Sequence, residues 1–398
     1  MISVEEAIAH ILKHLACVGP QTIFIDQSYG RVLSQDISSR VDSPPSAVSS
    51  MDGYAISVKD IEHLPVKLSV VGVSQAGRGF KGKINSGQTV RIYTGAPIPE
   101  GADKIIIQEE VEASDHQILI KKKVLKEKFI RESGLDFSVG DILLKKGTTL
   151  SARDVGLLAA MNIPSISVRR KPTVAIIATG DEVVMPGDPI GPDQIISSNS
   201  LLLSGYVQSL GGVPSIIGIA RDSVESLLET LSFVSGFDLI LTTGGASVGD
   251  FDLVQKALSS EDWILDFYKI AMRPGKPLIF GHLLETPLLG LPGNPVSAGV
   301  CCVVFLSVIM RSMLGIDDSR PLETVRLGSD LIENDARQDY LRADLKVLND
   351  GILTVFPFEI QDSSMISSFA KAKCLVVRPP FAPFIKSGEN VSILRLSH

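Results

Sequence analysis

The chain has 398 residues, of which 44% are hydrophobic, so it is long enough for roughly three or four domains with separate cores. It carries 38 basic and 45 acidic side chains, a net charge of −7, and no long basic run or stripe of basic and aromatic residues. This composition argues against a groove for nucleic acid, while a local basic pocket for a small anion stays compatible with it.

The N-terminal segment predicts an amphipathic helix. Ser3 followed by Glu6 is a capping-box pattern, in which a hydroxyl and a carboxylate bind backbone N–H groups at the start of the helix. The helix is expected to end near Cys17. The same pattern returns at Ser151 and Asp154, before a second helix.

Residues between these helices alternate between polar and apolar over 64–125, with breaks at Gly and Pro. Such alternation is typical of strands with one buried face. We therefore predict a mostly-β domain over 44–138, inserted into an N-terminal domain that is formed by 1–43 and 139–170.

Residues 171–317 predict an α/β domain. Short apolar runs alternate there with helical patterns, which is typical of a parallel sheet with helices on both faces. Ligands of such sheets bind beyond the carboxyl ends of the strands. The expected strands are 173–179, 215–219 and 239–243, and the expected helices are 198–210, 223–234 and 251–258.

An uncharged run over 296–310 raises the question of a membrane span. A span needs roughly 20 apolar residues. This run is shorter and contains Gly299, so we predict a buried helix and no membrane contact. The four cysteines lack CxxC spacing and no signal-peptide pattern precedes them, which predicts a cytoplasmic protein.

Short strands return in the last part of the chain, 318–398. Apolar runs over 341–348 and 352–357 flank Asn349-Asp350-Gly351, a hairpin signal because these residue types tolerate positive φ. A small barrel-like β domain is expected here.

Two glycine-rich turns follow predicted strands, ATGDE at 178–182 and TTGGASVGD at 242–250. We expect each to lead into a helix, where unpaired backbone N–H groups and the helix dipole bind anions. Their Asp and Glu side chains suit a divalent cation that bridges carboxylates to a phosphorylated ligand. Tight strand–helix packing with aspartate helix caps is the alternative, and neither turn is a Walker or GxGxxG loop.

Other candidate residues lie in loops. Asp52 and Thr94 could contact a ligand, but spacing alone favours an ordinary turn at Asp52, and an ordinary Pro- and Gly-containing loop also explains Thr94. Lys269, Arg273 and Lys276 form a basic group that suits a phosphate or another oxyanion, or a solvated loop. The six histidines are scattered and no pair has ligand spacing, so we expect no histidine zinc site.

Together these motifs resemble the molybdopterin molybdenumtransferases, the MoeA family to which the E domain of gephyrin also belongs. Their order and spacing match the family over essentially the whole chain. The motifs are MDGYA (51–55), TGAPIPEGAD (94–103), ATGDE (178–182), TTGGASVGD (242–250), RPGKP (273–277) and GLPGNPVSA (290–298).

The resemblance implies a fold, a reaction and an assembly. The implied α/β multidomain fold has a three-layer α/β/α molybdopterin-binding-like domain, an inserted mostly-β domain, an elongated N-terminal domain for dimerisation and a small C-terminal β domain. The implied reaction joins molybdate to adenylylated molybdopterin, releases AMP and depends on Mg²⁺. The implied homodimer has its active site between the α/β domain of one subunit and the inserted domain of the other. Contacts with the upstream adenylyltransferase and with recipient molybdoenzymes are also implied.

The resemblance also assigns roles to matching positions. The catalytic residues that it implies are Asp52, Thr94, Glu182, Asp222 and Asp252. The metal ligands that it implies are Glu182, Asp222, Asp250 and Asp252. The substrate-binding residues that it implies are Asp136, Thr179, Gly244, Gly245, Ser247, Lys269, Arg273, Lys276, Pro292, Asn294, Arg342 and Ser363.

Some positions depart from the family pattern. Leu135, Asp362 and Lys373 stand where an acidic residue, a glycine and an asparagine are usual. Two other functions match parts of the sequence. A molybdopterin adenylyltransferase resembles the α/β domain alone, and the inserted domain argues against it. A non-catalytic pterin-binding or assembly scaffold would not need the carboxylates.

Overall fold

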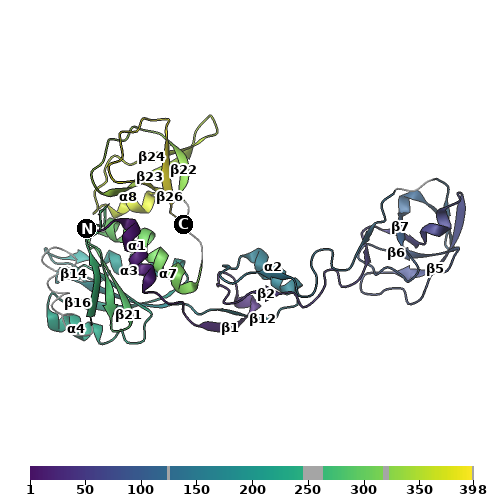
Figure 1. The fold of residues 1–398 in the computed structure, drawn as a ribbon, viewed down its shortest axis with the longest axis horizontal. Helices are drawn as coiled ribbons and strands as arrows, with labels where there is room; N and C mark the ends of the chain where they lie inside the picture. The colour runs from purple at the N-terminus through teal and green to yellow at the C-terminus, as the bar shows by residue number, and fades with distance from the viewer. Residues whose placement is uncertain (123–125, 245–262, 317–321, 397–398) are drawn as a thin grey trace. The chain divides into compact units, whose positions relative to one another are not determined.

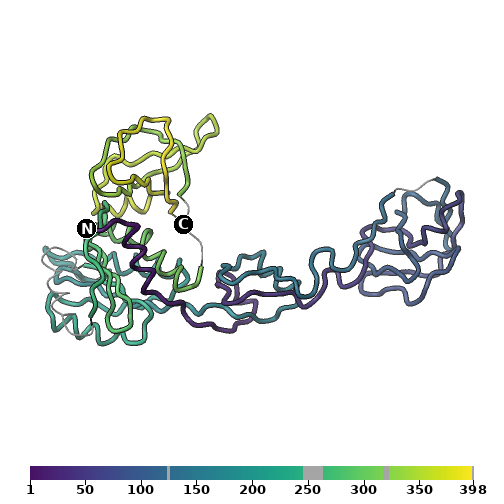
Figure 2. The backbone as a smooth tube through the Cα atoms, in the orientation of Figure 1, coloured from purple at the N-terminus to yellow at the C-terminus, as the bar shows by residue number. Residues whose placement is uncertain are grey.

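The structure, a computed structural model, describes residues 1–122, 126–244, 263–316 and 322–396. The chain folds into two compact units (Figures 1 and 2). The first unit consists of Met1–Gln21, Gly30–Ser34 and Val168–His398, and the second of Thr22–Tyr29 and Gln35–Ser167. A long internal segment therefore forms a unit of its own. The finer four-part division expected from the sequence remains a prediction.

The second unit contains a six-stranded sheet in the order β7-β4-β6-β5-β9-β8, as the polar and apolar alternation predicts. Its strands are β4 (Gly53–Ile56), β5 (Val66–Ser74), β6 (Gln88–Ile92), β7 (Lys104–Ile107), β8 (Glu112–Ala113) and β9 (Gln117–Ile120). Ile56, Leu68 and Ile106 are among the buried side chains of its core. Gly53 allows β4 to approach β7, because a Cβ atom there would lie 2.0 Å from the Ile106 carbonyl oxygen.

Short elements join this sheet to the rest of the chain. Helix α2 (Ala152–Ala160) begins with the predicted capping box of Ser151 and Asp154. The strand pairs are β1 (Pro20–Phe24) with β12 (Ser165–Arg169), β2 (Ile37–Ser38) with β11 (Ile142–Leu144), and β3 (Val48–Ser49) with β10 (Ile130–Arg131). Single turns of 3₁₀ helix lie at η1 (Ile25–Gln27), η2 (Val58–Ile61) and η3 (Gln108–Glu110).

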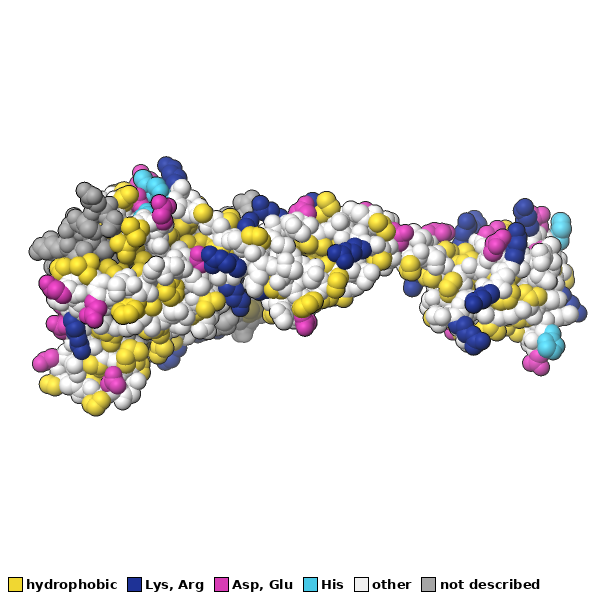
Figure 3. All heavy atoms as spheres, turned by 90° about the horizontal axis from the view of Figure 1, so that it is seen from below, with side chains coloured by type: hydrophobic (Ala, Val, Ile, Leu, Met, Phe, Trp, Pro, Cys, Tyr) yellow, Lys and Arg dark blue, Asp and Glu magenta, His cyan; other side chains and the backbone are white. Residues whose placement is uncertain are grey.

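Charged side chains of both signs are scattered over the face that Figure 3 shows. On the face shown in Figure 3, Lys and Arg are interspersed with Asp and Glu rather than gathered into one stripe. Such mixed surfaces keep the local electrostatic potential low.

The first unit begins with α1 (Val4–Lys13), which carries the predicted capping box of Ser3 and Glu6. The helix ends earlier than the expected Cys17. His14 is its C-cap, and the chain then turns so that the Val18 N–H donates to the Met313 carbonyl at 2.8 Å. A tertiary hydrogen bond therefore replaces the last helical turn that local spacing suggested.

The α/β part holds a six-stranded sheet in the order β16-β13-β17-β21-β20-β18. Its strands are β13 (Thr173–Thr179), β16 (Val213–Ala220), β17 (Leu239–Thr243), β18 (Trp263–Tyr268), β20 (Ile279–Leu283) and β21 (Thr286–Leu291). The prediction of a parallel sheet fails at one strand, because β20 runs antiparallel to both of its neighbours, β21 and β18. The two residues between β20 and β21 leave room only for a hairpin, and a hairpin forces that direction.

Helices cover both faces of this sheet, as predicted. Along β13, Val174 and Ile176 point into the core beneath α3 (Ser198–Ser209), while Ala175 and Ile177 pack against α4 (Val224–Leu231). The strand is buried on both faces, so it is a continuous apolar run instead of an alternating one.

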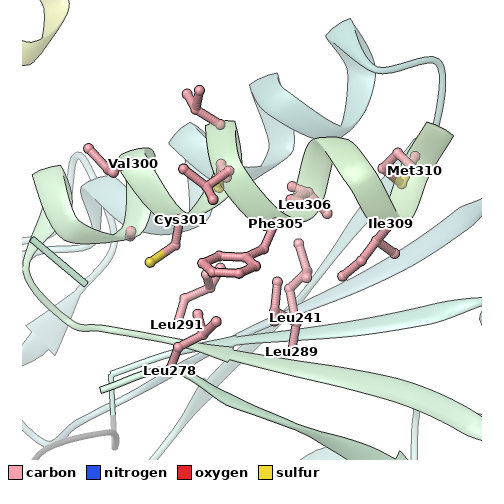
Figure 4. Packing of buried hydrophobic residues seen from close by; sticks show 14 of the residues in the cluster. Leu241, Leu278, Leu289, Leu291, Val300, Cys301, Phe305, Leu306, Ile309 and Met310 are labelled. Carbon is pink, nitrogen blue, oxygen red and sulfur yellow. The ribbon is translucent and has the colours of Figure 1, made fainter. Parts of the chain in front are cut away.

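The uncharged run over 296–310 lies within one helix, Pro295–Leu314, which also contains Arg311. This helix consists of α6 (Pro295–Cys301), a π-helical turn η4 (Cys302–Leu306) and α7 (Ser307–Leu314). At 20 residues it is longer than predicted, and among the described helices it alone has the length and hydropathy of a membrane span. However, 83% of its most apolar window is buried inside the protein. Figure 4 shows Phe305 pointing from this helix towards Leu278 and Leu291 beside the sheet.

The C-terminal strands close on themselves in the order β19-β23-β24-β22-β26-β25, with β25 also paired to β23, as the barrel-like prediction requires. These strands are β19 (Met272–Arg273), β22 (Glu323–Leu327), β23 (Gln338–Val347), β24 (Leu353–Pro357), β25 (Cys374–Arg378) and β26 (Asn390–Arg395), with α8 (Ile366–Lys371) beside them. The predicted hairpin forms at Gly351, whose φ is +78°. The sequence did not predict β19, which the α/β part contributes to this sheet.

Asp238, which directly precedes β17, forms hydrogen bonds that link the start of this strand to the start of β13. Its carboxylate accepts bonds from Arg170 and from the Thr173 amide at 2.7 Å and hydroxyl at 2.9 Å. Burial disfavours the charged carboxylate, but these hydrogen bonds outweigh it and hold the pKa of Asp238 below its ordinary value.

Replacing Asp238 with Asn is expected to lower the free energy of unfolding by about 1–3 kcal/mol at pH 7. Because the folded-state pKa is depressed, the stabilisation is present above the unfolded-state pKa and is lost as pH falls through the folded one. Urea unfolding of both proteins at pH 7 and in acid checks this. If the loss in free energy of unfolding were the same in acid as at pH 7, the assigned role of the Asp238 charge would be wrong. Asp193→Asn, at an exposed position, serves as the control.

Candidate functional site

A cavity of about 690 Å³ lies at the carboxyl ends of β13 and β17, where the topology predicts a ligand. Thr179 and Thr243 end these strands and are buried, and Gly244 follows directly. The opposite wall comes from the loop that contains Pro292 and Asn294, before α6. Thr179, Gly244, Pro292 and Asn294, which the sequence assigned to substrate binding, are thus brought together by the structure.

Gly244 is required by the close approach of the two strand ends. Its φ is +90°, and a Cβ atom there would lie 2.5 Å from the Thr179 carbonyl oxygen. A side chain would meet both backbone strain and a steric clash. The glycine therefore shapes the floor of the cavity.

Gly244→Ala is expected to destabilise the α/β part by about 1–3 kcal/mol through strain and clash together. Gly236→Ala is the matched control, because its φ is +83° and nothing lies within 4 Å of the added Cβ. Thermal unfolding should show a larger loss for Gly244→Ala than for Gly236→Ala. Equal losses would mean that the contact with Thr179 has no energetic consequence.

Asn199 is a site residue that the sequence did not reveal. Its side-chain amide donates to the Thr243 hydroxyl at 2.8 Å and to the Gly293 carbonyl at 2.7 Å, so it joins the two walls of the cavity. Its Oδ1 atom is buried and has no hydrogen-bond partner among the described residues. The only signal in the sequence was its position at the start of a predicted helix.

The first glycine turn differs from its prediction. After Gly180 the chain enters no helix but forms β14 (Val183–Val184) and β15 (Ile195–Ile196), and α3 begins only at Ser198. The amides of this turn are therefore not helix N-terminal amides. Gly180 instead leaves room for the Glu182 carboxylate, which a Cβ atom at this position would meet at 2.5 Å.

Acidic side chains gather at the ends of β13 and β16. The Asp181 amide donates to Asp222 Oδ2 and the Asp222 amide to Asp181 Oδ1, each at 3.3 Å. Glu182 lines the cavity beside them. These exposed carboxylates are hard oxygen donors of the kind that Mg²⁺ takes. Gly245, Ser247, Asp250 and Asp252 lie outside the described residues.

The three predicted cations do not form one free group. Arg273 donates to both carboxylate oxygens of buried Asp339, at 2.9 and 2.6 Å, so its charge is already paired. Lys269 has a φ of +71° and its ammonium lies 4.5 Å from the centre of the Tyr268 ring. Lys276 is exposed, and its neighbour Pro277 lines the cavity.

The C-terminal sheet contributes to the same cavity through Ser364. The hydroxyl of the neighbouring Ser363 accepts a hydrogen bond from the side-chain amide of Asn294 at 2.9 Å. The Ser363 carbonyl accepts one from the backbone N–H of Val296 at 3.1 Å. Asp362 caps this turn by accepting from the Ser364 amide and hydroxyl at 2.8 and 2.6 Å. Asp362 therefore orders the segment.

Arg342 does not face the cavity. It is buried, and its guanidinium donates to Gln361, to the Ser368 hydroxyl at 2.7 Å and to the carbonyls of Ile360 and Met365, both at 3.3 Å. In this structure Arg342 holds the segment that carries Ser363, and its assignment to substrate binding stays a prediction.

Lys373 likewise has a structural partner, since its ammonium lies 2.9 Å from the Asp344 carboxylate. Its side chain is therefore engaged within the C-terminal sheet. The lysine that replaces the usual asparagine is not a residue of the cavity wall.

In the second unit, Asp52 and Thr94 form a hydrogen-bonded pair. Asp52 Oδ1 accepts from the Thr94 amide at 2.7 Å and from its hydroxyl at 2.8 Å. The amide bond and then the hydroxyl bond hold the pKa of Asp52 below its ordinary value. The exposed carboxylate is therefore fixed in orientation and charged. Asp136 and Leu135 are exposed at another turn, where the Asp136 amide donates to the Ser43 carbonyl.

Two of the scattered histidines lie close to one carboxylate in the structure, and the absence of a histidine zinc site stays a prediction. His14, Asp266 and His282 have potential ligand atoms that all lie within 4.8 Å of one another. His14 lies about 250 residues before Asp266 and His282, which come from the paired strands β18 and β20, so spacing along the chain could not reveal the group.

Known proteins similar to this chain match it over nearly its whole length, and they all point to one family. Family models match the chain in succession: the MoeA N-terminal region (domain I and II) at 2–162, a probable molybdopterin binding domain at 175–311 and the MoeA C-terminal region (domain IV) at 324–396. A molybdopterin molybdenumtransferase of Nostoc sp. is 33% identical over 92% of this chain and 86% of its own length. A molybdopterin molybdenumtransferase 2 of Mycobacterium tuberculosis is 31% identical over 100% of both chains. A crystal structure of a molybdopterin biosynthesis MoeA protein from Pyrococcus horikosii matches with a TM-score of 0.86 and 30% identity over 99% of both chains.

Proposed function

Because this chain belongs to the MoeA family of molybdopterin molybdenumtransferases, we propose that it inserts molybdenum from molybdate into adenylylated molybdopterin and releases AMP. The observation that carries the proposal is the cavity at the ends of β13 and β17. It combines hydroxyls, a glycine floor and an adjacent group of carboxylates. Such a site can hold a phosphorylated ligand together with a cation.

The residues of the cavity have separate roles in this proposal. Thr179 and Gly244 bind the ligand through a hydroxyl and through close approach of the backbone, and Asn199 holds the two walls at a fixed distance. Lys276 attracts the molybdate dianion to the site. Asp52, oriented by Thr94, is proposed as a catalytic residue of the same reaction. Asp136, Gly245, Ser247 and Ser363 are proposed as further contacts.

Mg²⁺ is the proposed cofactor, and Glu182 and Asp222 are residues that would hold it. Their fit rests on chemistry and position: both are carboxylates, and the Asp222 oxygen lies 3.3 Å from the amide of Asp181, the neighbour of Glu182. When bound, the ion would neutralise charge on the pyrophosphate linkage as AMP departs. Asp250 and Asp252 are proposed as additional ligands.

The active enzyme is proposed to be a homodimer, with contacts to the upstream adenylyltransferase and to recipient molybdoenzymes. A non-catalytic scaffold is the alternative from another class. The matches to the MoeA N- and C-terminal regions support the transferase over an adenylyltransferase that consists of the α/β domain alone.

The test is a direct assay of the reaction. Purified protein is mixed with adenylylated molybdopterin and Mg²⁺, and AMP is measured by chromatography with and without molybdate. The proposal expects AMP that depends on both molybdate and the protein. A properly folded protein that binds the pterin and yields no AMP would support the scaffold instead.

A further inference from the structure

We propose that His14, Asp266 and His282 form a binding site for a divalent transition-metal ion of the zinc class, separate from the cavity of the proposed reaction. His14 caps the C-terminus of α1, Asp266 lies on β18 and His282 on β20, all within the first unit. One ligand atom from each lies within 4.8 Å of the others. Two imidazoles and a carboxylate are a donor set that favours zinc-class ions over Mg²⁺ or Ca²⁺.

The distances between these side chains resemble those between ligands of one metal. His282 Nδ1 lies 3.1 Å from Asp266 Oδ2, and His14 Nε2 lies 3.9 Å from Asp266 Oδ1. Ligands of a tetrahedral zinc ion stand roughly 3.3 Å apart, given bonds of about 2.0–2.1 Å. A small movement of the exposed His14 side chain would bring all three to one ion.

Hydrogen bonding does not account for the closest pair. Despite the 3.1 Å separation, Asp266 Oδ2 has no hydrogen-bond partner of acceptable geometry among the described residues. His282 Nε2 is also buried and has no partner there. Two polar atoms side by side but not aligned are what neighbouring ligands of a common ion present, whereas a hydrogen bond would align them.

The negative charge of Asp266 also favours a bound cation at this group. The side chains of Asp266 and His282 are each only 12% exposed, and within the described residues the ion-pair partners of Asp266 are the two histidines alone. A cation bound between the three side chains would balance the charge of this largely buried carboxylate. Glu285 lines the same small cavity and adds negative charge.

The backbone places Asp266 in this position by a β-bulge. Leu265 pairs with Gly281 and Phe267 pairs with Phe280, which leaves Asp266 as the extra residue. Bulges redirect the side chain of the extra residue and often lie next to functional sites. The edge of the Phe280 ring also packs against His282, with ring centres 5.4 Å apart, and restrains the imidazole. The cavity of about 290 Å³ leaves space for a water ligand.

Zinc competition with a chromogenic chelator tests the proposal on full-length, metal-free protein in excess Mg²⁺. We expect about one tight Zn²⁺ per chain, and His14→Ala and His282→Ala should each weaken binding roughly 10- to 100-fold or more. His10→Ala is the matched control, since His10 is exposed on the same helix and outside the group. Co²⁺ provides a second readout, because its visible absorption reports nitrogen and oxygen ligation and should disappear in His14→Ala.

Other results would overturn the site. Wild-type protein that holds no more Zn²⁺ than His14→Ala would mean that a proton, not a metal, completes the group. Zinc lost in Asp222→Asn and kept in His14→Ala would place it at the carboxylates near the large cavity. Because His14 is exposed at a helix end, its replacement keeps the test valid even if His282→Ala folds poorly.

Discussion

Asp52→Asn is expected to lower the rate of molybdate-dependent AMP release by about 100-fold, a typical loss when a charged group at a reacting centre is removed. The substitution keeps Oδ1 as an acceptor for both Thr94 donors and removes only the negative charge. The exposed position of Asp52 means that the fold should be unaffected. AMP chromatography gives the rate, and circular dichroism gives the fold.

Two further variants separate charge from orientation. Thr94→Val removes the 2.8 Å hydroxyl bond and keeps the amide bond, so a loss smaller than that of Asp52→Asn is expected. Asp115→Asn is the control, because Asp115 is an exposed aspartate in a turn of the same unit. Full activity of Asp52→Asn would remove this carboxylate from the mechanism.

Glu182→Gln and Asp222→Asn should each raise the Mg²⁺ concentration needed for half-maximal AMP release by about 10-fold or more, because each removes a charged oxygen ligand while keeping its shape. The double variant should lose most of its activity at any practical Mg²⁺ concentration. Titration of the rate against Mg²⁺ measures both effects.

Asp193→Asn controls for a general change in surface charge, since Asp193 is exposed in the same part of the chain. If Glu182→Gln and Asp222→Asn kept the wild-type Mg²⁺ dependence, the cation would have to be held elsewhere. A lower rate with an unchanged Mg²⁺ requirement would give these carboxylates a role in binding the substrate instead.

Features decided by local sequence were predicted well. The strands Thr173–Thr179 and Leu239–Thr243 match their predicted bounds, because a strand buried on both faces is a bounded apolar run. The capping box at Ser3 also formed as predicted, since its partners lie three residues apart. Spacing within one turn or one strand is visible in a sequence.

Features that depend on residues far apart in the sequence were not predicted. Arg273 seemed free for an anion until the fold brought Asp339 to it, 66 residues later in the chain. The end of α1 depends on Met313, and the group around Asp266 depends on a bulge and on a helix cap. In each case the deciding partner comes from another element, so periodicity carries no signal of it.

Arg342 holds the segment at the rim of the cavity mainly through its backbone, so the side chains of that segment can change. Two of its acceptors are main-chain carbonyls, those of Ile360 and Met365, which lie on either side of the short stretch that supplies Ser364 to the cavity. Main-chain anchors do not depend on the identity of the side chains between them. A substitution at 362–364 can therefore change the side chains at the rim of the cavity while the two carbonyls that bind Arg342 stay in place.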